Sequence, residues 1–229
     1  MDTLLKNFKQ FKITYTLILL NILAYLYTAF LSGDIIDMNI RVLANMGAIY
    51  GPITVLGEQW QDLGTAMFLH GGMTHILMNM FSLYLIGRAV EQYFNTVSYL
   101  SIYLFAGLIG GLVSLYMHPA SVGVGASGAI FGIFGALAGF FLAHRSKIEA
   151  HTKAFMKDFG IIIGINLVLG FSIESIDVSA HVGGLIVGAI GGYLISKNAK
   201  LVWVYSAAMI AVMMAFMSYL PSQYAQTLF

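Results

Sequence analysis

Long apolar stretches alternate with short polar connections along most of this chain, a pattern typical of a protein that crosses a membrane several times. One transmembrane helix needs roughly 20 predominantly apolar residues. The pattern predicts seven spans, at Ile13–Leu31, Gly72–Val90, Val97–Met117, Gly125–Ala143, Phe159–Phe171, Ala180–Ser196 and Leu201–Leu220. The fold class expected from it is all-α, a polytopic membrane helical bundle.

Two regions depart from this simple alternation. The first apolar run, Ile13–Leu31, follows several lysines and so resembles a secretory signal. It is longer than the apolar core of about 7–15 residues in such signals, which favours an uncleaved first span. The stretch 32–71 has mixed polarity and contains Trp60. We expect short interfacial helices there rather than a complete span.

The composition supports a membrane protein and excludes several other classes. Of the 229 residues, 59% are hydrophobic and only 9% are charged, and the mean hydropathy is +0.84. Soluble domains carry about 25% charged residues. A soluble domain, a disordered chain and a nucleic-acid binder of the basic-patch type are therefore excluded. The absence of cysteine excludes a disulfide scaffold, a thiolate metal site and a cysteine nucleophile.

Basic residues predict the orientation of the spans, because cytoplasmic loops hold most of the Lys and Arg. With the N-terminus inside, only Arg41 of the 11 basic residues falls on the outer side. The remainder fall inside, at Lys6, Lys9, Lys12, Arg88, Arg145, Lys147, Lys153, Lys157, Lys197 and Lys200. We therefore predict an N-in, C-out topology.

Polar side chains inside the predicted spans are the functional candidates, since ionisable groups in a membrane usually mark a site. His75 and Asn79, Ser127, and His181 begin the second, fourth and sixth spans. All three spans start at the outer face in this topology, so the four residues lie at similar depth. A serine becomes a nucleophile when a neighbouring neutral histidine takes its proton, and this set therefore suggests nucleophilic catalysis.

The surroundings of Ser127 fit this chemistry. A serine at a helix N-terminus has free backbone N–H groups beside it, which can stabilise an oxyanion. His75 and Asn79 are four residues apart, share a helix face and would add side-chain donors. The fourth and sixth spans contain G-x-x-x-G pairs, among them Gly128–Gly132 and Gly184–Gly188. Such pairs let helices approach closely, and we expect a hydrogen bond between Ser127 and His181.

Other interpretations of the same residues remain open. A zinc site of His70, His75 and His181 would lack a nearby carboxylate, and H-E-x-x-H is absent. A small transporter would also gather polar groups, but nearer the membrane midplane. A non-catalytic binder of membrane helices would keep the packing without an activated serine. Asp177 is expected to be a loop residue or a helix-start residue.

The remaining histidines fall in connections between spans. They are His118, His144 and His151. We expect these three side chains to be solvated.

Three motifs resemble those of the rhomboid family of intramembrane serine proteases. His70-Gly-Gly-Met-Thr-His75-Ile-Leu-Met-Asn79 is similar to H-x4-H-x3-N of the family. Gly125-Ala-Ser127-Gly, followed by Phe131, is similar to its G-x-S-G motif. Ala180-His181-Val-Gly-Gly with Gly188 is similar to A-H-x-x-G-x-x-x-G. The resemblance extends from about Met46 to Ser196.

The resemblance implies a role for each matching residue. Ser127 would be the nucleophile and His181 the general base, while His75 and Asn79 would be oxyanion donors. The supporting positions would be His70, Gly125 and Phe131. No cofactor and no metal would be required. One departure lies in the loop before the second span, where Gln61 follows Trp60 and many rhomboids have arginine.

The resemblance also implies an architecture, a substrate class and a location. A short cytoplasmic N-terminus (1–12) would precede a six-span core (13–196), followed by a seventh transmembrane helix and C-terminal tail (197–229). The partners would be the lipid bilayer and single-pass or polytopic membrane protein substrates, with no nucleic acid. Short loops and the lack of a recognisable targeting segment suit a bacterial inner or plasma membrane.

Overall fold

The computed structural model describes residues 10–146, 164 and 177–227, and the regular secondary structure of this part is helical. Four of its helices are long and apolar enough to cross a membrane. They are α2 (Lys12–Ser32), α8 (Thr96–Met117), α11 (Val178–Lys197) and α12 (Leu201–Thr227). A shorter apolar helix, α9 (Ser127–Ala143), lies between α8 and α11 in the sequence. The chain is therefore a multi-pass helical integral membrane protein.

Most predicted spans agree with these helices to within a few residues. The main difference is α12, which passes through Pro221 and continues to Thr227, beyond the expected end at Leu220. The predicted span Phe159–Phe171 falls, apart from Gly164, outside the described residues. The count of seven spans, the N-in orientation and the division of the chain at 12 and 196 stay predictions.

The second predicted span is one continuous helix with a local change of winding. It consists of α6 (Met73–Ser82), a π-helical turn η2 (Leu83–Gly87) and α7 (Arg88–Glu91). Its last residue, Glu91, accepts hydrogen bonds from the Ile13 and Thr14 backbone N–H groups at 2.8 and 2.9 Å. The first turn of a helix has no intrahelical partners for these groups. Glu91 therefore caps α2 from a neighbouring helix.

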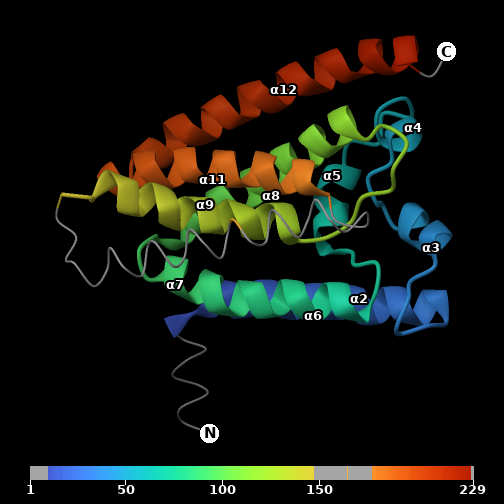
Figure 1. Cartoon of the computed structure of the whole chain (residues 1–229), viewed down its shortest axis with the longest axis horizontal. Helices are drawn as coiled ribbons and strands as arrows, with labels where there is room; N and C mark the ends of the chain where they lie inside the picture. Colours follow the sequence, from blue (N-terminus) through green and yellow to red (C-terminus); the bar gives the residue numbers. More distant parts are fainter. Residues whose placement is uncertain (1–9, 147–163, 165–176, 228–229) are drawn as a thin grey trace, which may run out of the picture.

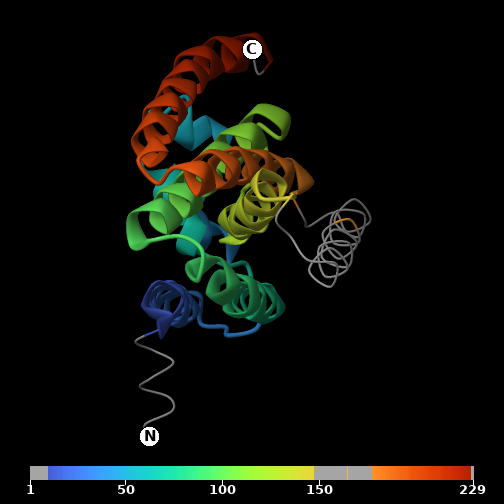
Figure 2. The ribbon, with the colours of Figure 1, turned by 90° about the vertical axis from the view of Figure 1, so that its left-hand side faces the viewer.

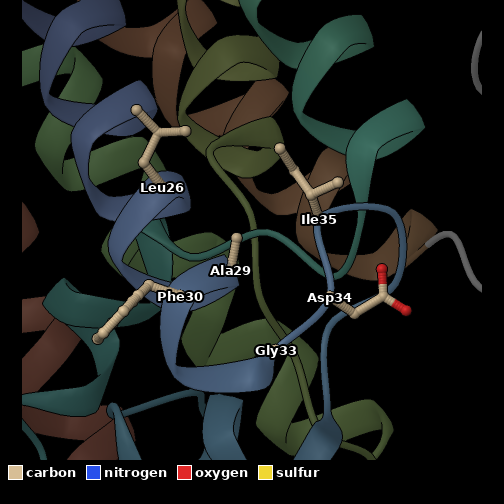
Figure 3. A pocket seen from close by; sticks show the side chains of 6 residues that line it. All are labelled: Leu26, Ala29, Phe30, Gly33, Asp34 and Ile35. Atoms are coloured by element: carbon tan, nitrogen blue, oxygen red, sulfur yellow. The ribbon is translucent and has the colours of Figure 1, made fainter.

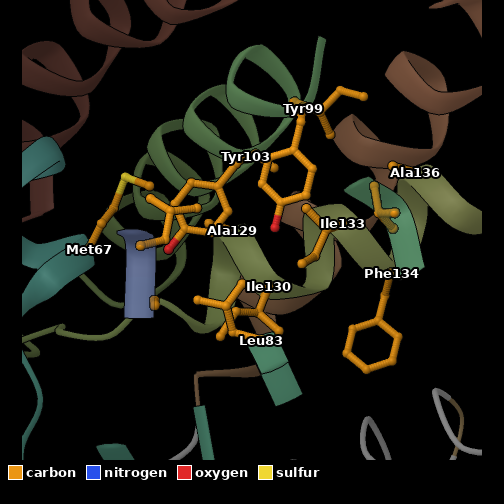
Figure 4. Close-up of a cluster of buried hydrophobic side chains, with 14 of the residues drawn as sticks. Met67, Leu83, Tyr99, Tyr103, Ala129, Ile130, Ile133, Phe134 and Ala136 are labelled. Carbon is orange, nitrogen blue, oxygen red and sulfur yellow. The ribbon is translucent and has the colours of Figure 1, made fainter. Parts of the chain in front are cut away.

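The helices form two groups that are visible in Figures 1 and 2. The first group is α2 with α6 and α7, which run side by side. In the second group α8, α9 and α11 pack against one another, and α12 lies on α8 and α11. Buried side chains join the groups, and in Figure 4 Leu83 of η2 lies beside Ile130 of α9. The hydrophobic core is thus centred on α9.

The stretch between α2 and α6 contains short helices, as predicted from its mixed polarity. These are α3 (Ile40–Asn45), α4 (Gly51–Thr54), α5 (Asp62–Thr65) and the 3-10 helix η1 (Ala66–Phe68). Single antiparallel bridges join Asp37 to Gly72 and Ile49 to Gly123. The loop therefore holds the segments that lead into α6 and α9, where the candidate residues lie.

Candidate active site

Ser127 is the first residue of α9, with Ala126 at the N-cap position. The first hydrogen bond of the helix runs from the Ile130 N–H to the Ala126 carbonyl at 2.9 Å. The N–H groups of Ser127 and the next two residues consequently have no partner within the helix. The serine itself is half-buried. Its hydroxyl thus lies next to a set of unused backbone donors.

Gly125, two residues earlier, occupies a position where a side chain does not fit. Its φ of +127° is one that residues with a side chain rarely adopt. A Cβ atom there would lie 2.8 Å from Nε2 of His75 and 3.7 Å from Oγ of Ser127. The Gly125 N–H donates to the Ala66 carbonyl at 2.9 Å. The His75 and Ser127 side chains therefore border the same small space beside Gly125.

The hydrogen bonds of His75 determine which ring nitrogen can donate into that space. Nδ1 accepts a hydrogen bond from the Gly71 N–H at 3.4 Å. A neutral imidazole that accepts at Nδ1 carries its proton on Nε2. The Nε2–H group is thus the donor on the side of Gly125 and Ser127. Asn79 is buried, and its side-chain amide donates to the His75 carbonyl at 3.1 Å within the same helix.

His181 lies one turn into α11 and stacks on an aromatic ring of α9. Its imidazole and the Phe131 ring are nearly parallel, with an interplanar angle of 9° and a centroid separation of 4.2 Å. In the part of the chain that the structure describes, no hydrogen bond joins His181 to the Ser127 hydroxyl. Catalytic hydrogen bonds often tighten only in the complex with substrate. The expected contact between the two side chains stays a prediction.

Glycines bring α9 and α11 together along their length, which confirms the close packing predicted from the G-x-x-x-G pairs. A Cβ on Gly188 would collide with the Gly132 carbonyl, and one on Gly184 with the Gly128 carbonyl. At the start of the helices, the Cβ position of Gly128 is 3.5 Å from the Ala180 carbonyl oxygen. The residue after Ser127 therefore lies close to the residue before His181.

His70 lies in the segment before α6 and is completely buried. Its ring meets the His75 ring edge-on, with centroids 5.1 Å apart. Burial, with a smaller effect of the neighbouring His75, lowers the pKa of His70 to about 3, so this imidazole is neutral. Among the residues with described positions, no group of three His, Cys, Asp or Glu side chains is arranged to hold a metal ion. His70 is therefore a neutral, buried imidazole that packs against the His75 ring.

Residues at the end of α8, the start of α11 and the end of α9 have more interactions than the sequence suggested. Asp177 is the N-cap of α11, as expected for a helix-start residue. His118, expected to be solvated, is half exposed, and its Nε2 lies 4.0 Å from the Asp177 carboxylate. His144 contacts the Phe140 carbonyl through Nδ1 at 2.9 Å. His151 lies outside the described residues.

A hollow at the end of α2 is separate from this cluster. Its lining is mainly apolar and comprises Leu26, Ala29, Phe30, Gly33, Asp34 and Ile35 (Figure 3). None of the candidate residues belongs to it. The site is therefore defined by the helix starts and not by this pocket.

The fold and the cluster together define a polytopic helical membrane protein that gathers a serine and several histidines at helix starts. The Rhomboid domain family matches residues 57–198, which is more than half of the chain. The chain belongs to the rhomboid family.

Curated relatives agree with this assignment. The chain is 37% identical over 179 residues to Rhomboid protease GluP of Bacillus subtilis, covering 76% of this chain and 33% of GluP. It is 34% identical to RHOMBOID-like protein 6, mitochondrial, of Arabidopsis thaliana, covering 70% of this chain and 52% of that protein. It is 32% identical to RHOMBOID-like protein 7 of the same plant, covering 77% of this chain and 56% of that protein. The match thus spans between a third and somewhat more than half of these relatives.

Proposed function

We propose that the chain is an intramembrane serine protease that hydrolyses peptide bonds of transmembrane substrates near the outer membrane face. Ser127 and His181 would form its catalytic dyad. The observation that carries the proposal is the close approach of the first turns of α9 and α11, where the Cβ position of Gly128 lies 3.5 Å from the Ala180 carbonyl oxygen. Ser127 and His181 each lie next to one of these two residues. Family membership and the protease names of relatives such as GluP support the same activity.

In the proposed reaction, His181 takes the Ser127 hydroxyl proton as the oxygen attacks the scissile carbonyl carbon. The tetrahedral intermediate collapses when the C–N bond breaks and His181 gives that proton to the leaving amine. A water molecule then attacks the acyl ester while His181 takes one of its protons. The proton returns to the Ser127 oxygen as the carboxyl product leaves.

The oxyanion would be held by donors on two helices. The free N–H groups of the first turn of α9 supply backbone donors. The His75 Nε2–H borders the same space and would supply a side-chain donor. Asn79 has one amide hydrogen engaged by the His75 carbonyl and a second that remains to serve the site. Phe131 would hold the His181 ring in orientation by stacking.

The topology and location are part of the same proposal. Ten of the 11 basic residues favour an N-in, C-out arrangement of a six-span core (13–196), a short cytoplasmic N-terminus and a seventh C-terminal span. This places the starts of α6, α9 and α11 at the outer face. The curated relatives include proteins of a bacterium and of a plant mitochondrion. The short loops lead us to propose a bacterial plasma membrane.

The transporter and the non-catalytic binder predict different behaviour of the serine. Neither requires an activated hydroxyl, whereas the protease does. A serine-directed fluorophosphonate should therefore label the purified chain at Ser127 and give no label after Ser127→Ala or His181→Ala. Ser121→Ala is the matched control, because Ser121 is an exposed serine in the loop before α9.

Cleavage of a transmembrane reporter substrate in liposomes completes the test. Ser127→Ala should abolish cleavage, and Ser121→Ala should leave it unchanged. Loss of one oxyanion donor typically slows catalysis by about 10²–10³-fold, so Asn79→Ala should be impaired but active. Cleavage by the purified Ser127→Ala protein would refute the mechanism.

A further inference from the structure

The helix that carries His181 begins with a carboxylate that holds its first turn. Asp177 Oδ1 accepts hydrogen bonds from the Ala180 N–H at 3.1 Å and from the Ser179 hydroxyl at 2.5 Å. The His181 N–H donates to the Asp177 carbonyl at 3.3 Å. Residues four apart share one helix face. Asp177 is thus joined, through its side chain and its backbone, to the turn that ends at His181.

A second helix brings a histidine to the same carboxylate. His118 is the C-cap of α8, and its Nε2 lies 4.0 Å from Asp177 Oδ1. Burial alone would raise the pKa of Asp177, but hydrogen bonds from Ser114, Ser179 and the Ala180 N–H, together with the charge of His118, lower it overall. Asp177 is therefore ionised at neutral pH, and it lies one turn before His181, at the i, i+4 spacing that puts two side chains on one face of a helix.

We propose that Asp177 is a positioning residue for His181. Its carboxylate fixes the first turn of α11, and its negative charge favours the imidazolium that forms when His181 takes the Ser127 proton. His118 acts as a counterion that weakens this charge when it is protonated. This inference rests on the protease function proposed above.

The other charged groups around the pair are few. His75 is a further titratable group of the site, and it lies on α6 beside Gly125. α8 contributes His118, which lies beside the Asp177 carboxylate, and Ser114, whose neutral hydroxyl donates a hydrogen bond to that carboxylate. α9 contributes Ser127 and no titratable side chain before its C-cap His144. Asp177 is therefore the negative charge in the described surroundings of His181.

A purely structural cap and an electrostatic partner make different predictions for one substitution. Asparagine caps helices about as well as aspartate, so Asp177→Asn keeps the hydrogen bond to the Ala180 N–H and removes the charge. Asp177→Ala removes both. If the charge matters, the Asn variant should keep the thermal stability of the parent protein but alter its pH–rate profile.

The experiment measures kcat/KM for a transmembrane reporter, and the rate of fluorophosphonate labelling, between pH 5 and 9 for the full chain in liposomes. For Asp177→Asn we expect the acid limb of both profiles to move about half a pH unit lower, because a lost negative charge disfavours the imidazolium. The plateau rate should fall about threefold to tenfold. An unchanged profile would overturn the proposal.

His118→Gln provides the opposite perturbation at a residue outside the catalytic cluster. It removes the counterion, so the acid limb should move to higher pH. Opposite shifts for the two variants support the proposal, whereas shifts in the same direction overturn it. If Asp177→Asn does not fold, the His118→Gln profile decides alone, and no shift refutes the inference. Residual cleavage by Ser127→Ala would instead refute the protease function, so the two failures are distinguishable.

Discussion

The contact between α9 and α11 gives a sharp test of how the fold controls the site. A Cβ on Gly188 would lie 2.7 Å from the Gly132 Cα and closer still to its carbonyl oxygen. Carbon atoms in contact are normally about 3.5–4.0 Å apart, so Gly188→Ala must separate the helices by about 1 Å at this point. The clash is with backbone, and no flexible side chain can move aside to relieve it.

The consequence for activity follows from the position of Gly188, two turns after His181 on the same helix. A misplacement of about 1 Å in a catalytic constellation can cost about 10²-fold in rate. Overpacking of a well-packed core typically costs about 1–3 kcal/mol. We therefore expect Gly188→Ala to lose about 100-fold in kcat/KM, with a lowered thermal unfolding temperature.

The assay compares reporter cleavage in liposomes, fluorophosphonate labelling and thermal unfolding for three proteins. Gly64→Ala is the matched control, since a Cβ on Gly64 of α5 meets no atom within 4 Å. That variant should behave like the parent chain. If Gly188→Ala cleaves within threefold of the parent rate and unfolds at the same temperature, the tight glycine interface does not position the dyad.

Three further predictions concern other contacts. Phe131→Leu should lower kcat, because it removes the ring stacked on His181, and it should lower the unfolding temperature only modestly, because leucine keeps most of the buried apolar volume; equal kcat for the variant and the parent would contradict this role. Burial raises the pKa of Asp62, and the Thr54 hydroxyl, which donates to its carboxylate at 3.0 Å, opposes this shift. Because the folded chain holds this proton more tightly than the unfolded chain, the folded state should lose stability as the pH rises from the unfolded pKa of about 3.9 through the higher folded pKa. Asp62→Asn should remove that loss in thermal scans between pH 4 and 7, and a retained slope would refute it. Glu91→Ala should destabilise the chain by about 1–2 kcal/mol in chemical unfolding, because the N–H groups at the start of α2 lose their acceptor; Glu91→Gln should recover part of this.

The apolar spans could be predicted from the sequence because a helix in lipid must be apolar along its whole length. The runs that predicted α2, α8, α9 and α11 have boundaries close to the observed ones, and the run that predicted α12 begins at the observed residue. The glycine spacing also predicted which helices approach closely, since i and i+4 positions share one face. These features depend on local pattern alone.

The details that depend on distant residues were not predictable in this way. The π-helical turn of Leu83–Gly87 lies within an apolar run, and apolar composition does not distinguish an α-helix from a π-helix. Glu91 caps a helix 77 residues away, and no local signal links it to Thr14. The tautomer of His75 follows from the Gly71 N–H, which only the folded loop places at Nδ1. The motifs thus selected candidate residues, while the fold set their hydrogen bonds.

The candidate residues are divided between the two groups of helices, and this division affects how the site can fail. Ser127 and His181 lie on α9 and α11, whose backbones pack closely against each other at glycines. His75 and Asn79 lie on α6, which packs with α2 in the other group (Figures 1 and 2). α9 contacts η1, α6, η2 and α7, and the Gly125 N–H is bonded to η1 through the Ala66 carbonyl. A change at this junction would therefore displace the proposed oxyanion donors while leaving the proposed dyad intact, and it should slow cleavage without abolishing fluorophosphonate labelling of the serine.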